Sequence, residues 1–276
     1  MIKRKTTGSI VCPNCGRLVS ANAAECMHCG KKNPGLWGFG PELKRFFGGF
    51  SDIISQITVA CVFLYVLALL LQPMAIFQSR GIFDILGPDM RALDKLGMTG
   101  TYAVSQGRWW TIVTAIYLHG SLLHILFNML WIRQLGHTVL ELFGSARTFL
   151  IFTIAGAAGF VISNLVGIPF TVGASGSIFG LLGALVYYGR KRGGYFGMAV
   201  YRQVGTWAIV LFLFGFFMST VNNFAHAGGF IGGYLAAMLL GFLEIRAENS
   251  RHRRAALLCA LGTIAAFIVE IIGNVF

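Results

Sequence analysis

Charged side chains are scarce in this chain. Asp, Glu, Lys and Arg together make up 12% of its 276 residues, whereas 56% of the residues are hydrophobic. A soluble globular domain of this length needs more polar side chains to cover its surface, so the composition excludes that class. Apolar runs of roughly 18 residues or more recur along the chain, which is the length that a transmembrane helix requires. The sequence therefore predicts an all-α polytopic membrane protein.

Acidic residues are scarcer than basic ones: ten Asp and Glu stand against 22 Lys and Arg, for a formal net charge of +12. The basic residues lie in short clusters between apolar runs, where membrane topology puts them, so no nucleic-acid partner is expected. The basic residues of Met1–Lys5 lead into a cysteine-rich segment and not into an apolar one. No cleavable signal peptide is therefore expected.

We expect three parts: a small polar module over 1–35, a linker over 36–56, and a membrane domain over 57–276 with seven transmembrane helices. The predicted spans are 57–77, 115–136, 147–168, 175–190, 204–221, 225–244 and 255–275. With a cytoplasmic N-terminus, only four of the 22 Lys and Arg lie outside, namely Arg80, Arg91, Lys95 and Arg108. The positive-inside rule then predicts that the N-terminus lies inside and the C-terminus outside. The expected location is a prokaryotic plasma membrane, with the protein integral to it.

Polar residues from three of these spans share one depth. Spans two, four and six all run inward, so His124, Asn128, Ser175 and His226 lie in their outer halves. Serine becomes a nucleophile when a base accepts its proton, and histidine suits that role. Small residues at four-residue spacing let helices approach closely in a bilayer, so Ser175 Oγ can meet His226. They are Gly173, Gly176, Gly180 and Gly183 in span four, and Gly228, Gly229, Gly232 and Gly233 in span six.

None of the ten acidic residues is expected at this depth in spans two, four or six, so serine chemistry here would use a Ser-His dyad without a third member. His124 and Asn128 are four residues apart on one helix face and can donate to a developing oxyanion. The backbone N–H of Ser175, at a helix start, is a third donor. Simpler interpretations stay open: a serine bonded to its own helix, a histidine that joins helices or relays protons, and glycines that only pack.

At these residues the chain resembles the rhomboid family of intramembrane serine proteases. The matching stretches are His119–Met129 (HGSLLHILFNM), Gly173–Gly176 (GASG) and Ala225–Gly233 (AHAGGFIGG). The resemblance covers about 105–245. It implies a rhomboid-like six-helix core, with span seven as an extra C-terminal transmembrane helix.

The resemblance also implies roles for residues. Ser175 would be the nucleophile and His226 the base, with His124 and Asn128 in the oxyanion hole. Phe179 would support the histidine ring, and His119 would organise polar groups and water. The chain departs from the family in two places. The family's Trp-Arg pair reads Trp110-Thr111 here, with Arg108 upstream, and its Glu at the inner end of span two falls at Leu140, beside Glu141.

The expected activity is cleavage of transmembrane segments of membrane proteins near the outer membrane face, without a catalytic cofactor. The expected partners are transmembrane protein substrates and membrane lipids. The alternative is a non-catalytic rhomboid-like protein that binds or chaperones membrane proteins. A transporter or channel is disfavoured because no inverted repeat or internally charged helix is evident.

Four of the six cysteines form two C-x2-C knuckles separated by ten residues: Cys12 with Cys15, and Cys26 with Cys29. Four thiolates at this spacing fit tetrahedral zinc, and the glycine after each knuckle permits a tight turn. A cytoplasmic location disfavours structural disulfides. The sequence thus predicts a zinc-ribbon-like module held by a structural zinc, with a redox-active or disordered tail as the alternative. The motif does not name a partner.

Overall fold

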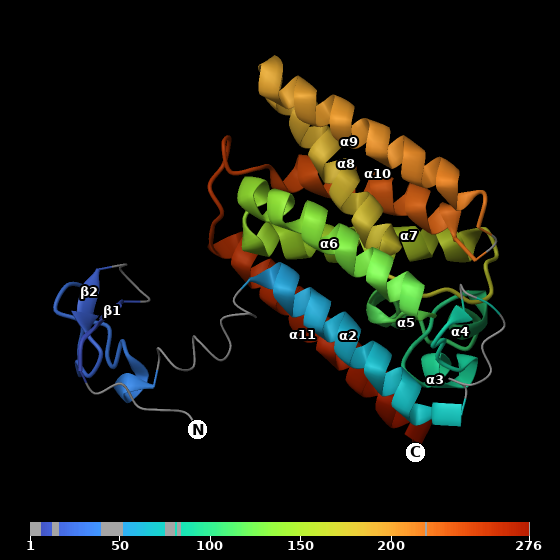
Figure 1. Ribbon diagram of the computed structural model, residues 1–276, viewed down its shortest axis with the longest axis horizontal. Coiled ribbons are helices and arrows are strands. Elements are labelled where there is room, and N and C mark those ends of the chain that lie inside the picture. Colours follow the sequence, from blue (N-terminus) through green and yellow to red (C-terminus); the bar gives the residue numbers. More distant parts are fainter. Residues whose placement is uncertain are drawn as a thin grey trace. The chain divides into compact units, whose positions relative to one another are not determined.

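The computed structural model describes residues 7–12, 17–39, 52–74, 81, 84–218 and 220–275 (Figure 1). The chain divides into two compact units, residues 1–56 and 57–276. The finer division of the first unit into a module over 1–35 and a linker stays a prediction.

The first unit is built around a two-stranded antiparallel sheet. Strand β1 (Ser9–Val11) pairs with β2 (Leu18–Ser20), and the short 3-10 helix η1 (Leu36–Gly38) follows. Its buried core is Cys12, Val19 and Cys26. A core this small supplies little stabilisation, so such units usually depend on a metal or on disulfides.

Seven long helices dominate the rest of the described chain, one at each predicted span. They are α2 (Ile53–Leu71), α6 (Leu122–Phe143), α7 (Ser145–Leu165), α8 (Ser175–Arg192), α9 (Gly194–Gly215), α10 (Asn223–Leu240) and α11 (Ser250–Val275). Four of them, α2, α7, α9 and α11, are long and apolar enough to cross a membrane. A fifth is added if the bent pair 111–117 and 122–143 is counted as one span. The mainly helical architecture confirms the predicted polytopic fold.

Helix α8 is the centre of this unit and packs against α6, α7, α9 and α10 (Figure 1). Its most extensive partner is α10, and glycines line the contact. A Cβ atom on Gly233 would overlap the backbone of Gly180, and one on Gly229 would overlap the backbone of Gly176. The two helices therefore touch backbone to backbone, as the glycine spacing predicts.

The predicted start of span two was wrong. The chain turns by 90° between residues 111–117 and 122–143, so the long helix begins at 122 and not at 115. Leu118 is extended, which ends the preceding short helix, and the Ser121 side chain accepts a hydrogen bond from His124 N and caps α6. Predicted span five also begins earlier than expected, at 194 and not at 204.

The long connection between α2 and α6 contains short helices that the sequence analysis did not predict. They are α3 (Met90–Lys95), α4 (Thr101–Ser105), α5 (Thr111–Thr114) and the 3-10 turn η5 (Ala115–Tyr117). Helix α3 begins after Asp89, whose carboxylate accepts a 2.8 Å hydrogen bond from Arg91 N. This segment lies directly before α6 and against α7 and α8.

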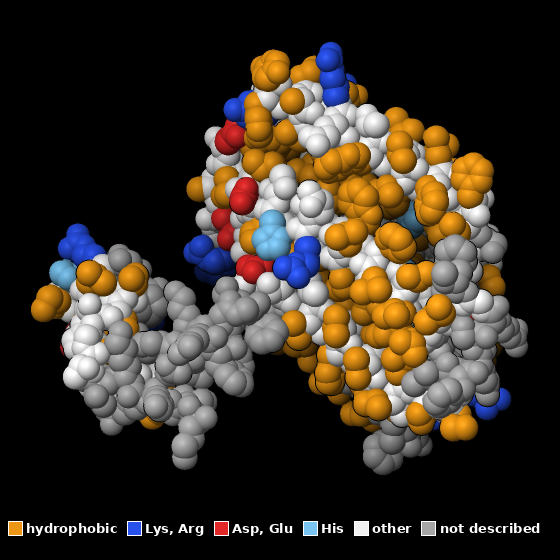
Figure 2. All heavy atoms as spheres, in the orientation of Figure 1, with side chains coloured by type: hydrophobic (Ala, Val, Ile, Leu, Met, Phe, Trp, Pro, Cys, Tyr) orange, Lys and Arg blue, Asp and Glu red, His pale blue; other side chains and the backbone are white. Residues whose placement is uncertain are grey.

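Hydrophobic side chains cover much of the face of the helical unit seen in Figure 2, while Lys and Arg lie at its margins. Large apolar residues are exposed along the long helices, for example Leu165, Leu239 and Leu258. Exposed apolar surface of this extent is unfavourable in water and suits contact with lipid. With its apolar helices, the protein is an integral membrane protein.

The connection between α10 and α11 is fastened to the start of α7. The Arg147 side chain is fully buried, and its Nη2 donates to the carbonyls of Arg246 and Ala247 at 2.7 and 2.9 Å. The Glu248 carboxylate accepts from Ala146 N at 2.8 Å and so caps α7. These contacts could not be predicted from the sequence, because about a hundred residues separate the partners.

Candidate active site

The structure brings Ser175 and His226 together. Ser175 is the first residue of α8 and His226 lies in the first turn of α10. His226 Nε2 lies 2.9 Å from Ser175 Oγ, which is hydrogen-bond distance. The helices come this close because Gly176 and Gly229 face each other directly below the pair. Ser175 and His226 thus have the geometry of a nucleophile and its base.

Two local features set up this contact. Gly173 has a φ of +129°, which a side chain would strain, and its N–H donates to Ala115 O at 2.9 Å. At the start of α10, the Asn222 side chain accepts from Ala225 N at 3.0 Å. Hydrogen bonds therefore hold the backbone just before Ser175 and the first turn that contains His226.

The ring of His226 is held by Phe179, one turn below Ser175. The two rings stack with centroids 4.2 Å apart and planes inclined by 15°. His226 is 6% exposed, and its Nδ1 has no hydrogen-bond partner in the part of the chain that the structure describes. No described acidic side chain therefore completes a triad. A ring protonated at Nδ1 leaves Nε2 free to accept the Ser175 proton.

Two side chains of α6 converge on the turn before Ser175. His124 Nδ1 accepts a 3.3 Å hydrogen bond from Gly120 N, so in the neutral ring the proton sits on Nε2. A Cβ atom built on Gly173 would lie 2.7 Å from His124 Nε2 and 3.9 Å from Asn128 Nδ2. Both N–H donors thus lie beside the backbone of residue 173. A side chain at this position would collide with His124, so only a glycine fits there.

His119 contacts His124, but we observe no contact of its side chain with Ser175 or His226. It is fully buried, and its ring lies edge-on to that of His124, with centroids 5.1 Å apart. It therefore packs behind a candidate oxyanion donor.

Asn222 is a residue of this site that was not predicted from the sequence. Besides capping α10, its Nδ2 donates to Ser163 Oγ at 2.6 Å and to Thr171 Oγ1 at 3.2 Å. It ties α7, the loop before α8 and the start of α10 to one another. An Asn three residues before Ala225 is the pattern of a helix N-cap, so a search for caps would have identified it.

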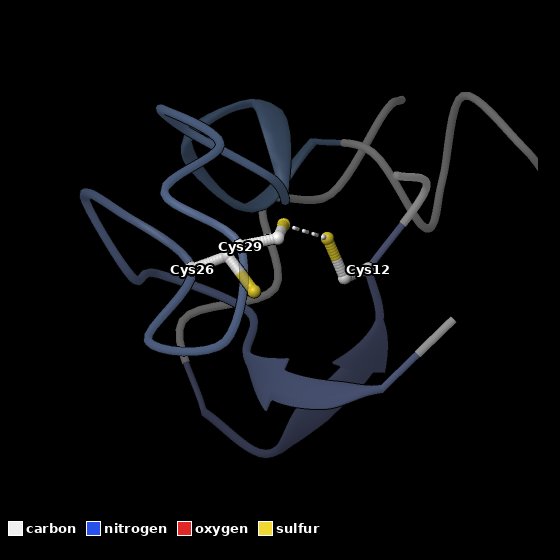
Figure 3. A group of neighbouring side chains, drawn as sticks. All are labelled: Cys12, Cys26 and Cys29. Atoms are coloured by element: carbon white, nitrogen blue, oxygen red, sulfur yellow. Dashed lines mark hydrogen bonds between the residues drawn. The ribbon is translucent and has the colours of Figure 1, made fainter. Parts of the chain in front are cut away.

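The first unit contains a cluster of cysteine side chains (Figure 3). The sulfur atoms of Cys12, Cys26 and Cys29 lie within 4.8 Å of one another, and those of Cys12 and Cys29 are 3.7 Å apart. Sulfur atoms around a tetrahedral zinc, with Zn–S bonds of about 2.3 Å, are separated by about 3.8 Å. The three thiols fit a metal. Gly30, after the second knuckle, has a φ of +70°, while Cys15 lies outside the described residues.

The fold is that of a helical membrane protein in which Ser175 and His226 lie within hydrogen-bond distance of each other. Comparison with known proteins gives its family. A family model described as "Rhomboid domain" matches residues 106–242. Rhomboid protease GluP of Bacillus subtilis (strain 168) is 39% identical over 162 residues, which are 57% of this chain and 31% of the relative. YdcA from the same organism is 32% identical over 152 residues, which are 54% of this chain and 74% of the relative.

RHOMBOID-like protein 5 of Arabidopsis thaliana is 33% identical over 167 residues, which are 56% of this chain and 52% of the relative. This chain thus spans about a third of the length of GluP and about half of that of the plant protein. It belongs to the rhomboid family.

Proposed function

We propose that this protein is an intramembrane serine endopeptidase that uses Ser175 and His226 as a catalytic dyad. The observation that carries the proposal is the 2.9 Å contact between Ser175 Oγ and His226 Nε2. The name of its relative, rhomboid protease GluP, supports the same class of activity.

The reaction follows from the geometry. His226 Nε2 takes the Ser175 proton as Oγ attacks the scissile carbonyl, and a tetrahedral intermediate forms. His124 Nε2, Asn128 Nδ2 and the Ser175 N–H stabilise its oxyanion. The protonated His226 then donates to the leaving amine, and the peptide C–N bond breaks. A water molecule, deprotonated by His226, hydrolyses the acyl-enzyme and restores Ser175.

The substrates we propose are transmembrane segments of other membrane proteins, cut near the outer membrane face. Eighteen of the 22 Lys and Arg lie on the inner side when the N-terminus is cytoplasmic, which puts Ser175 near the outer side. A transmembrane helix satisfies its own backbone hydrogen bonds, so it must unwind locally before a peptide bond reaches Ser175. Substrates with helix-destabilising residues such as glycine are therefore favoured.

The first unit is proposed to bind one structural zinc through Cys12, Cys26 and Cys29, with Cys15 as the fourth ligand. Zinc would hold the two knuckles and supply the folding energy that the small core lacks. It has no part in the peptide-bond chemistry proposed for the second unit.

Purified Ser175→Ala protein tests the activity, with Ser177→Ala as the matched control. Ser177 lies two residues further along α8, is fully buried, and its Oγ has no hydrogen-bond partner among the described residues. We expect Ser175→Ala to abolish cleavage of a model transmembrane substrate in liposomes and Ser177→Ala to retain it. Cleavage by the Ser175→Ala protein at the wild-type rate would refute the proposal. Wild-type protein that binds the substrate without cutting it would support a binding or chaperone role instead.

A further inference from the structure

One carboxylate is buried in α11, the C-terminal helix. Glu270 is 1% exposed and lies in the apolar part of this helix, whose other charged residues, Arg251, Arg253 and Arg254, are at its N-terminal end. Its Oε1 lies 2.8 Å from Arg108 Nη2, and its Oε2 accepts a 2.6 Å hydrogen bond from Trp110 Nε1. A carboxylate in a membrane helix is costly unless it is paired, so these two contacts offset the cost of placing a charge there.

Both partners stand at the start of α5. Trp110 is the N-cap residue of that helix, and Arg108, two residues earlier, also pairs with Asp94 at 2.8 Å. Gly97 fits closely against the carboxylate side chain: a Cβ atom there would lie 3.2 Å from Glu270 Cγ. The family's Trp-Arg pair is thus replaced by a Trp and an Arg that bind one carboxylate of α11.

A second contact joins α11 to the same segment. The ring of Phe267, one turn before Glu270, meets the ring of Tyr117 edge-on, with centroids 6.1 Å apart. Tyr117 ends η5, so α11 contacts the α5–η5 segment at both of its ends. More broadly, α11 packs against α5 and α7.

The α5–η5 segment in turn supports the turn that leads to Ser175. Ala115 O accepts the 2.9 Å hydrogen bond from Gly173 N. Thr111 Oγ1 lies 3.0 Å from Thr99 Oγ1, and Thr99 forms a two-bond bridge with Thr171. The backbone of 171–173 is therefore fastened to α5 and to the loop in front of it.

We propose that Glu270 is a positioning residue for peptide-bond cleavage. It holds Arg108 and Trp110, these hold the α5–η5 segment, and that segment fixes Gly173, against which His124 and Asn128 are aligned. The seventh helix would then act on the reaction from a distance by keeping the oxyanion donors in register with Ser175. This inference rests on the proposed protease function.

The change Glu270→Gln tests it. Glutamine keeps the volume and can still accept from Trp110, but it removes the charge that pairs with Arg108. The matched control is Glu244→Gln, which removes the charge of the exposed pair between Glu244 and Arg192, 3.0 Å apart and away from the site. Full-length proteins are compared for kcat and KM on a transmembrane model substrate, for the rate of Ser175 labelling by a fluorophosphonate, and for thermal unfolding.

We expect Glu270→Gln to lower both kcat and the labelling rate by about tenfold, because small displacements of reacting groups are costly to rate. KM should stay within about twofold, since substrate binding is not what the contact serves. Arg108→Gln should lower both rates at least as much, because it also removes the ion pair with Asp94. The double variant should be little worse than Arg108→Gln alone, because both changes remove the Arg108–Glu270 contact. Glu244→Gln should match the wild type.

A Glu270→Gln protein with wild-type kcat and labelling rate, but a lower unfolding temperature, would overturn the inference and leave Glu270 a purely structural residue. If that variant does not fold, Arg108→Gln decides by the same readouts. A wild-type protein that neither cleaves nor labels would contradict the protease function itself, an outcome distinct from equal rates in wild type and variant.

Discussion

The contact between α8 and α10 can be tested by adding one methyl group, with Gly233→Ala. The new Cβ would overlap the carbonyl oxygen, the carbonyl carbon and the Cα of Gly180. These are backbone atoms, so no side chain can rotate away and the helices must separate by on the order of 1 Å. Overpacking of this kind destabilises a protein by about 1–3 kcal/mol.

The separation also reaches the active site. Gly180 lies five residues after Ser175 on the same helix, so moving the helices apart there lengthens the 2.9 Å Ser175–His226 contact. A misplacement of about 1 Å can cost about a hundredfold in rate. We therefore expect Gly233→Ala to lose both stability, measured by unfolding in detergent micelles, and cleavage of a transmembrane substrate.

The matched control is Gly262→Ala in α11, where an added Cβ meets nothing within 4 Å. Alanine is the better helix former by about 1 kcal/mol, so this variant should be as stable as the wild type or slightly more so. If Gly233→Ala is as stable and as active as Gly262→Ala, the close packing of α8 on α10 does not position the dyad and the reasoning is wrong.

Two further predictions concern other parts of the chain. Cys26→Ser should lose the zinc measured by elemental analysis of the purified protein, whereas Cys61→Ser, in a membrane helix, should keep it; equal zinc in both would exclude the knuckles as its ligands. Arg147→Met should destabilise the protein by about 3 kcal/mol in an unfolding assay, because the buried guanidinium that donates to two carbonyls of the α10–α11 connection is lost. Arg133→Met, an exposed change, should have little effect, and similar losses for the two would contradict this interpretation.

Much of the fold and the approach of Ser175 to His226 could be predicted from the sequence, because they depend on local patterns. Apolar runs gave the seven helices. Glycines at four-residue spacing gave the close contact of α8 with α10, and the spacing of His124 and Asn128 put them on one face. Each of these patterns can be recognised within a single short stretch of the sequence.

What could not be predicted depends on contacts between distant parts of the chain. The 90° turn before α6 comes from an extended Leu118 and a cap at Ser121, which hydropathy does not register. The sequence predicts no acidic residue at the depth of the dyad in spans two, four or six, and Glu270 lies in span seven. Its partners Arg108 and Trp110 lie about 160 residues upstream, and nothing in the spacing of the chain links them to it.

The central claim is that Ser175 is a nucleophile activated by His226. The most direct measurement is mass spectrometry of the protein after exposure to a fluorophosphonate, with wild type beside His226→Ala. We predict one adduct, located on Ser175, in the wild type, and labelling of His226→Ala slower by at least about a hundredfold, since the general base is gone. Equal labelling of the two proteins, or an adduct on another serine, would contradict the account.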